Sequence, residues 1–277
     1  MAKRSVTKSD GRIAIIGCGN IGTAIARGLV SAGVYDPGQL ILTRRQVEPL
    51  GELAQAGFTV QADNRDAVRQ SDIVMLAVQP QQMVEVLSEI VPDIRQDHVI
   101  FSIVSGVSIA EVIQCLGQAV PVIRVMPNTA IEIGESITCL AALPEHGQAL
   151  DMALALFGSV GNTMIITEEL MVPATALGAC GVAFFLRCIR AASQGGIEIG
   201  FHPHEALLIA AQTARGAASL VLEQGEHPEA AIDVVTTPRG ATIAGLNNME
   251  HEGLSSALIK GIVTSAGKVA GLFAREN

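Results

Sequence analysis

The chain is poor in aromatic residues: it contains no tryptophan, one tyrosine and seven phenylalanines among 277 residues. Its core must therefore be built mainly from Ala, Val, Leu and Ile, which suits close-packed helices and parallel strands. Only 16% of the residues are charged and 49% are apolar, so a chain of this length can bury a sizeable core. The net charge is -9, and no stripe of basic and aromatic residues occurs, which argues against nucleic acid as a partner.

The cysteines are few, odd in number and irregularly spaced, with no C-x-x-C pair. They are Cys18, Cys115, Cys139, Cys180 and Cys188. This pattern predicts reduced thiols in a cytoplasmic protein and neither a disulfide framework nor a zinc site. His202 and His204 flank a proline but have no evident third ligand, so we expect no metal site. The first ten residues are polar, so we expect no signal peptide.

One stretch, Leu170–Leu186, carries no charge. It is just shorter than the ~20 residues that a membrane-spanning helix needs, and it is rich in Gly and Ala. We therefore expect a buried helix and no membrane partner.

The first part of the chain alternates short apolar runs with amphipathic segments. Strands are expected at Arg12–Ile16, Gln39–Thr43, Ile73–Val78, Val99–Ile103, Val120–Val125, Ile137–Ala142 and Thr163–Ile166, and helices at Ile21–Ala32, Val47–Ala56, Gln81–Ile90, Ile109–Leu116 and Glu145–Phe157. This βαβ alternation predicts a parallel sheet that is covered by helices on both faces.

From Thr167 onward the strand-like runs stop and long Ala-rich segments follow. Helices are expected within Pro173–Gly195, His204–Glu223, Glu229–Val235, Ala241–His251 and Leu254–Glu276. Small residues in the first of these segments favour an interlocked helical dimer. The predicted fold is thus an α/β N-terminal domain (residues 1–166) with a Rossmann-type, doubly wound parallel sheet, followed by an all-α dimerisation domain (residues 167–277).

The segment Arg12–Leu29, "RIAIIGCGNIGTAIARGL", has the pattern of a strand, a glycine turn and a helix. Three of its glycines form the spacing G-x-G-x-x-G, which allows a tight turn, the approach of a pyrophosphate to the backbone, and close packing of helix on strand. The setting predicts a dinucleotide site, and a chance glycine turn is the alternative. The cofactor-binding residues expected here are Gly17, Gly19, Asn20, Ile21 and Gly22.

The next strand ends at Thr43, Arg44 and Arg45, where an NAD site usually has an acidic residue for the ribose 2′-hydroxyl. A hydroxyl and two guanidiniums suit a 2′-phosphate. The expected cofactor is therefore NADP(H), with NAD(H) kept open as a second one. A solvated basic loop is the alternative interpretation.

Three later strands should end at the same edge of the sheet, where ligands gather in open parallel sheets. The turn after "LAVQP" predicts cofactor contacts from Ala77, Val78, Gln79 and Pro80. In "VIRVMPNTA", Met126 would shape the wall and Asn128 would face the nicotinamide or the substrate. The P-N-T sequence is equally typical of an ordinary turn.

The segment "TTPRGAT" places Thr237 as a good N-cap before Pro238. The amides of the next three residues would then be unpaired donors at a helix start, which favours an anion. Thr242 offers a hydroxyl one turn further on. The anion-site residues are Arg239, Gly240 and Ala241. An ordinary capped helix is the alternative.

The chain resembles the pyrroline-5-carboxylate reductase family over nearly its whole length. The resemblance rests on the motifs GCGNIG, LAVQP, SIVSGVSIAEV, RVMPNTA and VTTPRGATIAGLNNME. It implies NADPH-dependent reduction of 1-pyrroline-5-carboxylate to L-proline in homodimers that assemble further into rings, with the site between the cofactor of one subunit and helices of its partner. It also implies that the carboxylate is bound by Thr237, Gly240 and Ala241, that Thr242 lies beside the imine nitrogen and acts in catalysis, and that Cys180 belongs to the substrate helix.

The chain departs from the family pattern at several positions. The family segment S-G-S-G-P-A-Y reads Gly178–Phe184, "GACGVAF", in this chain. In addition, Gln79 stands where the family commonly has lysine. Arg239 stands where the family usually has glycine, and Ala130 where it often has proline. A different cyclic imine therefore stays open as the substrate.

Two other functions remain. A β-hydroxyacid dehydrogenase has a similar domain order but needs a lysine or comparable acid on its central helix, and no lysine lies between Arg12 and Asn248. A non-catalytic, NADP(H)-binding regulatory dimer is the third interpretation, and the altered Gly178–Phe184 segment motivates it.

Overall fold

The computed structural model describes residues 11–271. The described residues divide into two compact units: residues 11–180 with 265–271, and residues 181–264. The boundary predicted from sequence, at residue 167, lies before this division, and stays a prediction.

The first unit is built on one eight-stranded sheet with the order β3-β2-β1-β4-β5-β6-β7-β8. All neighbouring strands are parallel except β6 and β7, which are antiparallel. The doubly wound, mainly parallel sheet is thus confirmed. The strands are β1 (Ile13–Ile16), β2 (Leu40–Thr43), β3 (Thr59–Gln61), β4 (Ile73–Leu76), β5 (Val99–Ser102), β6 (Val122–Met126), β7 (Ser136–Ala142) and β8 (Gly161–Ile165).

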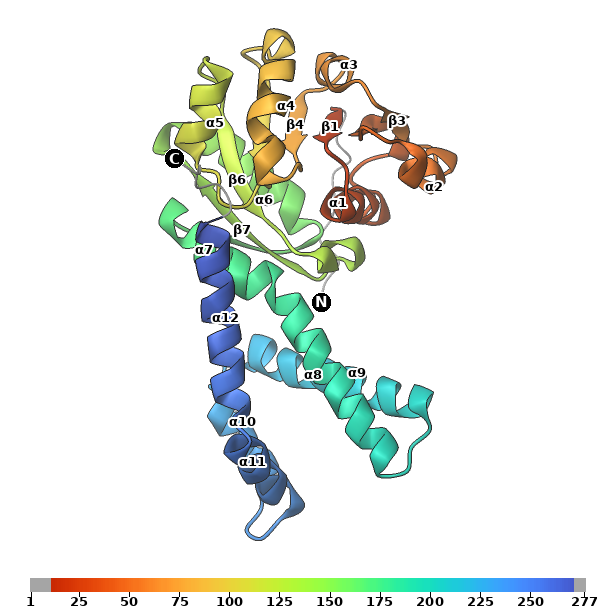
Figure 1. The fold of residues 1–277 in the computed structure, drawn as a ribbon, viewed down its shortest axis with the longest axis vertical. Coiled ribbons are helices and arrows are strands. Elements are labelled where there is room, and N and C mark those ends of the chain that lie inside the picture. The colour runs from red at the N-terminus through yellow and green to blue at the C-terminus, as the bar shows by residue number, and fades with distance from the viewer. Residues whose placement is uncertain (1–10, 272–277) are drawn as a thin grey trace. The chain divides into compact units, whose positions relative to one another are not determined.

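Helices cover both faces of the sheet (Figure 1). Alternate residues of each strand point to opposite faces, so Ile13 and Ile15 join one core cluster while Ala14 and Ile16 join another. The first cluster packs against α1 (Asn20–Ser31), α2 (Gly51–Gln55) and α6 (Gly147–Gly158), and the second against α3 (Asn64–Arg69), α4 (Met83–Ile90) and α5 (Ile109–Leu116). Short 3₁₀ turns complete the unit at Pro37–Gln39 (η1), Glu48–Leu50 (η2), Pro80–Gln82 (η3), Val91–Asp93 (η4), Thr129–Ile133 (η5), Pro144–His146 (η6) and Glu168–Leu170 (η7).

Every strand expected from the sequence is present, but β3 and α3 were not predicted. The half-buried β3 has only three residues, which is too short for a clear alternation of apolar and polar residues. It extends the sheet beyond β2 and carries the chain back to α3, next to the end of β2.

The strand order places a crevice between β1 and β4. From β1 the chain proceeds outward to β2 and β3, then returns to the other side of β1 as β4. The connections that follow β1 and β4 therefore diverge at their carboxyl ends, and ligands bind at such switch points in open α/β sheets.

The helical part follows β8 and begins with an interrupted helix: α7 (Met171–Ala174), a π-helical turn η8 (Thr175–Ala179) and α8 (Gly181–Glu198). Pro203–Gln224 (α9) packs closely on α8, where a Cβ added at Gly196 would lie 3.0 Å from the Cβ of Ala206. The remaining helices are α10 (Pro228–Val235), α11 (Ala241–His251) and α12 (Leu254–Ala270). The last helix was expected to continue to Glu276, which lies outside the described residues.

The expectation of a buried helix at Leu170–Leu186 was wrong for the single chain. Leu177, Phe185 and Leu186 are each more than half exposed. By length and composition alone, Glu168–Glu198 is the one stretch of residues 11–271 that could cross a membrane, and only 17% of its apolar window is buried within the chain. So many uncovered apolar side chains need a cover that this chain does not supply by itself.

Candidate functional site

The glycine turn after β1 is shaped by a close approach of two chain segments. Gly17 has φ +82, and a Cβ added there would overlap Cγ1 of Val78, which follows β4. Only glycine combines that backbone conformation with that contact. Gly22 packs closely against side chains, because an added Cβ would lie 3.1 Å from Ile15 Cγ2 and 3.2 Å from Cys18 Sγ. The pattern thus acts as predicted in the backbone: one glycine for the turn and one for packing helix on strand.

Thr43 holds the glycine turn through its hydroxyl and its carbonyl. It is fully buried, and its hydroxyl accepts from the amide of Gly17 at 3.3 Å and donates to Asn64 Oδ1 at 2.6 Å. Its carbonyl accepts from the amide of Cys18 at 2.7 Å. The expectation that this hydroxyl joins the arginines at a phosphate stays a prediction, and it requires the hydroxyl to leave these hydrogen bonds within the protein.

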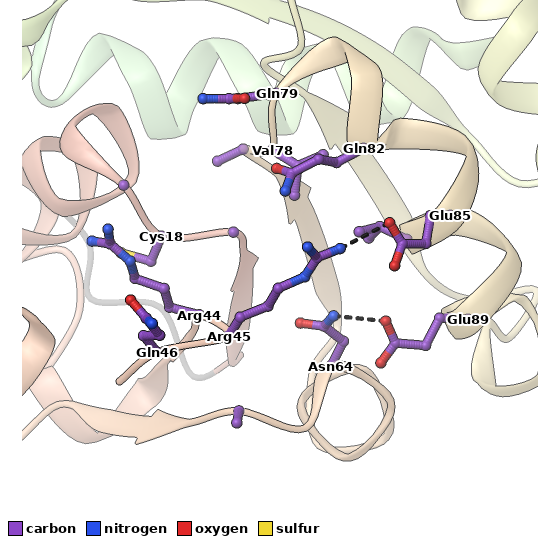
Figure 2. A pocket seen from close by; sticks show the side chains of 15 residues that line it. Cys18, Arg44, Arg45, Gln46, Asn64, Val78, Gln79, Gln82, Glu85 and Glu89 are labelled. Atoms are coloured by element: carbon purple, nitrogen blue, oxygen red, sulfur yellow. Dashed lines mark hydrogen bonds and ion pairs between the residues drawn. The ribbon is translucent and has the colours of Figure 1, made fainter. Parts of the chain in front are cut away.

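A cavity of about 550 Å³ opens beside the glycine turn at the crevice between β1 and β4. Figure 2 shows its lining: the ends of β1, β2 and β4 provide one side, and α4 provides the other. Its lining residues are Gly17, Cys18, Gly19, Arg44, Arg45, Gln46, Ala62, Asn64, Ala77, Val78, Gln79, Gln82, Glu85, Val86 and Glu89. A second cavity, of about 410 Å³, shares Gly19 and Arg44 and adds Asn20.

The cavity carries balanced charge. Arg45 Nη2 lies 2.8 Å from Glu85 Oε2, and Asn64 Nδ2 donates to Glu89 Oε2 at 2.9 Å. In Figure 2, Arg45 extends across the cavity towards α4, while Arg44 points towards Cys18 and the glycine turn. The two arginines therefore differ in what they are free to bind.

The residues present fit a dinucleotide. Gly19 is the N-cap of α1 and has no side chain to occupy the first amides of the helix. Those amides, the helix dipole and Arg44 together favour a phosphate group at this point. When bound, the dinucleotide would be held by the glycine turn and by the side chains at the end of β2.

The structure gathers only part of the predicted cofactor residues around the two cavities. Those that line them are Gly17, Gly19, Asn20, Arg44, Arg45, Ala77, Val78 and Gln79; those that do not are Ile21, Gly22, Thr43, Pro80, Met126 and Asn128. Glu85 and Glu89 were missed, because the polar face of an amphipathic helix does not reveal which of its residues meet a cleft.

Asn128 is a structural residue. Its Oδ1 accepts from the amide of Ala130 at 3.0 Å, and its Nδ2 donates to the carbonyl of Gly178 at 3.2 Å. The side chain is buried and caps η5. This arrangement agrees with the alternative of an ordinary turn, and the expectation that Asn128 faces the nicotinamide or substrate stays a prediction. Met126 also lies in a core cluster, with Ala141 and Met171.

A buried ion pair lies at the ends of β5 and β6. Arg124 is 5% exposed, and its Nη1 lies 3.3 Å from Glu168 Oε1, which also accepts from the amide of Ile109 at 2.6 Å. Burial lowers the pKa of Arg124, and Glu168 partly opposes this. Arg124 Nη2 and the hydroxyl of Ser102, its register partner on β5, have no hydrogen-bond partner. The carboxylate of Glu168 thus occupies the N-terminus of α5.

The tip of α11 differs from the expected geometry. The N-cap is Gly240, three residues after the predicted Thr237, and the amide of Gly240 donates to the carbonyl of Thr237 at 2.9 Å in a turn. Pro238 precedes the helix and is not its first residue. The free amides therefore begin at Ala241 and include Thr242, so the amide of Gly240 is not available as predicted.

Within this turn, Arg239 has φ +59, and it is the only described residue other than glycine with a positive φ. A Cβ at Gly240 would overlap the hydroxyl of Thr237, so glycine is needed there.

All five cysteines are free thiols. Burial raises the pKa of Cys18, which lies between the first two glycines of the turn. Cys180 follows the π-helical turn, and its amide donates to the carbonyl of Thr175 at 2.9 Å. No group of three His, Cys, Asp or Glu within residues 11–271 is arranged to hold a metal ion.

The sheet order, the glycine turn and the cavity beside it define a Rossmann-type, dinucleotide-dependent oxidoreductase with a helical second part. Residues 12–106 match the family described as NADP oxidoreductase, coenzyme F420-dependent, and residues 168–272 match the family described as pyrroline-5-carboxylate reductase dimerisation. The chain is 46% identical to pyrroline-5-carboxylate reductase 2 of Dictyostelium discoideum over 94% of this chain and 93% of that one. The chain belongs to the pyrroline-5-carboxylate reductase family.

Other comparisons agree. Pyrroline-5-carboxylate reductase 1 of Dictyostelium discoideum is 48% identical over 96% of this chain, although the match spans only 51% of that longer relative. A Streptococcus pyogenes 1-pyrroline-5-carboxylate reductase structure superposes with a TM-score of 0.81 at 29% identity, covering 94% of this chain and 98% of that one. The fold is shared with the Plasmodium falciparum pyrroline carboxylate reductase with NADP bound, at a TM-score of 0.88 and 22% identity, covering 97% of this chain and 100% of that one.

Proposed function

We propose that the chain reduces 1-pyrroline-5-carboxylate to L-proline with NADPH. The observation that carries this proposal is the cavity beside the glycine turn, where the uncapped start of α1 and Arg44 are directed at the same space in a chain of this family. The Plasmodium falciparum structure of the same fold was determined with NADP bound, which supports the same class of cofactor here.

The reduction of a cyclic imine needs few acid or base groups from the protein. The bound cofactor supplies a hydride to the carbon of the C=N bond, and a proton completes the amine. The protein has to hold the ring close to the nicotinamide, and such positioning can contribute several kcal/mol to lowering the barrier. Two groups of this chain are suited to that positioning, namely the turn around Gly17 for the cofactor and the start of α11 for the carboxylate.

The start of α11 is an anion-binding element by itself. The free amides of Ala241 and Thr242 and the helix dipole favour a carboxylate, and the Arg239 side chain adds a positive charge nearby. By its place in the family motif, Thr242 binds the imine nitrogen through its hydroxyl. The hydroxyl of Thr237 completes the carboxylate site, for which the amide of Gly240 is not free.

The working form in this proposal is a cytoplasmic homodimer, with rings of dimers as a further assembly. Residues 168–272 carry the family's dimerisation domain, and this region holds the exposed Leu177, Phe185 and Leu186. Because such apolar side chains are costly in water, a second copy is the expected cover. Each site then combines the cofactor of one subunit with α11 of its partner.

The test is direct. The purified protein, NADPH and pyrroline-5-carboxylate are mixed, and the loss of NADPH absorbance is followed together with the formation of proline. Thr242→Ala should lower kcat more than it changes the affinity for NADPH, and Thr242→Ser, which keeps the hydroxyl, should restore much of the rate. Equal turnover in the alanine variant would remove Thr242 from the mechanism.

A second candidate is the reduction of another cyclic imine. The observation that favours it is the segment Gly178–Phe184, which lacks two hydroxyls, the proline and the tyrosine of the family pattern. The same assay with a panel of cyclic imines separates the cases. Oxidation of NADPH only with other imines supports this candidate, and binding of NADPH without turnover on any imine supports a regulatory dimer.

A further inference from the structure

The two arginines after β2 have different partners. Arg45 pairs with Glu85 of α4 at 2.8 Å. For Arg44, no carboxylate of the described residues lies within ion-pair distance, and its side chain lines both cavities beside the glycine turn. Of the two arginines at the end of β2, Arg44 therefore has no acidic partner among the described residues, whereas Arg45 is already paired with Glu85 (Figure 2).

The two acids that face this cavity also have different partners. Glu89 accepts a hydrogen bond from the amide of Asn64, which in turn accepts from the hydroxyl of Thr43. Glu85, one turn earlier on the same helix, holds the guanidinium of Arg45. Glu89 thus accepts from an uncharged donor in a chain of hydrogen bonds that reaches the glycine turn, whereas Glu85 pairs with a cation.

The end of β2 has no acid for a ribose 2′-hydroxyl. The residue at that place is Thr43, which is fully buried with its hydroxyl engaged. Discrimination between a 2′-phosphate and a 2′-hydroxyl then depends on the guanidiniums of Arg44 and Arg45 and on any carboxylate that pairs with them. A 2′-phosphate has to draw Arg45 away from Glu85 before it can pair with that guanidinium.

We propose that Glu85 sets the ratio of NADPH to NADH affinity by competing with the 2′-phosphate for Arg45. This inference rests on the proposed function only in taking the ligand to be a nicotinamide dinucleotide. Glu85 weakens the binding of a 2′-phosphorylated nucleotide and leaves the unphosphorylated one almost unaffected. The side chains of Arg45 and Glu85 are 66% and 70% exposed, so the effect is moderate: about two- to fivefold in affinity, as for other exposed ion pairs.

The experiment measures binding without catalysis. Calorimetric titration of the full chain with adenosine 2′,5′-bisphosphate (2′,5′-ADP) and with 5′-AMP compares two nucleotides that differ at the 2′ position only. Glu85→Gln should raise the affinity for 2′,5′-ADP by about two- to fivefold and leave that for 5′-AMP unchanged. Glu89→Gln is the matched control, because it removes the same charge from the same helix and cavity without freeing an arginine, and it should have a smaller effect. Nicotinamide fluorescence gives a second reading with NADPH and NADH, since the chain has no tryptophan.

A double-mutant cycle isolates the pair. Arg45→Gln should weaken 2′,5′-ADP, and adding Glu85→Gln to that variant should then change little. Two results would overturn the inference in favour of a general charge effect. One is an equal gain in affinity for 2′,5′-ADP from Glu85→Gln and from Glu89→Gln. The other is a gain in that affinity from Glu85→Gln that persists in the Arg45→Gln variant. If both nucleotides bind and Glu85→Gln changes neither, only this inference fails. If the unmodified chain binds neither, the proposed function fails with it.

Discussion

Asn128 Nδ2 donates to the carbonyl oxygen of Gly178 at 3.2 Å, across 50 residues of sequence. The bond joins the turn after β6 to the π-helical turn that interrupts the start of the long helix. The backbone amide of Asn128 is held as well, by the hydroxyl of Ser136 at 3.2 Å. π-Helical turns are costly and are often found at functional sites. Asn128 therefore helps to fix the register in which the altered segment Gly178–Phe184 begins.

Asn128→Ala should destabilise the fold by about 1–3 kcal/mol, because the amide of Ala130 and the carbonyl of Gly178 both lose a buried partner. Asp63→Ala is the matched control, since Asp63 caps α3 at the surface and makes no long-range bond. Its cost should be about 1 kcal/mol or less. Urea unfolding of both variants measures the difference. Equal losses would mean that the bond to Gly178 contributes nothing.

Gly17→Ala should abolish dinucleotide binding. The methyl group would overlap Val78 and force apart the two segments that form the cavity. Gly33→Ala is a close control, because Gly33 has a similar φ of +73 but nothing within 4 Å of an added Cβ. It should cost only the backbone strain, about 1–2 kcal/mol, and should still bind NADPH. Fluorescence titration checks binding, and a Gly17→Ala variant that binds normally would contradict this account of the turn.

Local patterns predicted the glycine turn, the doubly wound sheet and the helical second part, because each depends on spacing within a short segment. The features that were not predicted arose where a partner far away in the sequence decides the hydrogen bonding. Thr43 is a hydroxyl at the end of a strand, and nothing local says that Gly17 and Asn64 already occupy it. The bond from Asn128 to Gly178 was not predicted, because Gly178 lies in another element.

The tip of α11 shows a different limit. Thr237 and Pro238 are a favourable pair for a helix start, yet the chain first makes a turn through Arg239 and begins the helix at Ala241. A positive φ at an arginine has no signature in the sequence. Glu85 is a further example, since its contact with Arg45 depends on how α4 faces the end of β2.

Glu168→Ala should destabilise the protein by about 3–5 kcal/mol, because Arg124 would remain buried with its charge unpaired. The amide of Ile109 would also lose its acceptor. Glu52→Ala is the control, because Glu52 is an exposed partner of Arg27 and its loss should cost well under about 1 kcal/mol. Chemical denaturation of the two variants tests this. Similar small losses would show that water already compensates Arg124.

Stability should fall between pH 7.5 and 5.5 in part because of His98. Its pKa is lowered by burial, and its ring accepts from the amide of Arg95 and contacts the carbonyl of Ser71. A base whose folded-state pKa lies below its unfolded value of 6.5 binds more protons when unfolded. Its stabilising contribution is therefore complete above that value and is lost as the pH falls towards the folded-state pKa.

Thermal or urea unfolding at several pH values checks this, and His98→Gln should be less stable at pH 7.5 but show a shallower slope. The carboxyl of Asp93 cannot supply the slope in this range, because Arg65 lowers its pKa below 3.8. An unchanged slope in the variant would show that other groups titrate in the window.

Variants of Arg239 should separate the effect of backbone strain on stability from the effect of charge on substrate binding at the start of α11. An arginine at φ +59 costs about 1–2 kcal/mol relative to an unstrained residue, and such strain persists where the surrounding structure imposes it. Arg239→Gly removes strain and charge together, Arg239→Ala removes only the charge, and Arg239→Lys keeps both. We expect the glycine variant to be more stable than the alanine variant by about 1 kcal/mol.

If the charge helps to hold the substrate carboxylate, KM for the imine should rise in the glycine and alanine variants by the same factor and stay nearly unchanged in the lysine variant. Steady-state kinetics at saturating NADPH, read beside urea unfolding, separates the two effects, because strain shifts the unfolding midpoint and charge shifts KM. A KM that follows stability rather than charge across the three variants would mean that the guanidinium does not act on the substrate. The amides of Ala241 and Thr242 would then be left to hold the carboxylate.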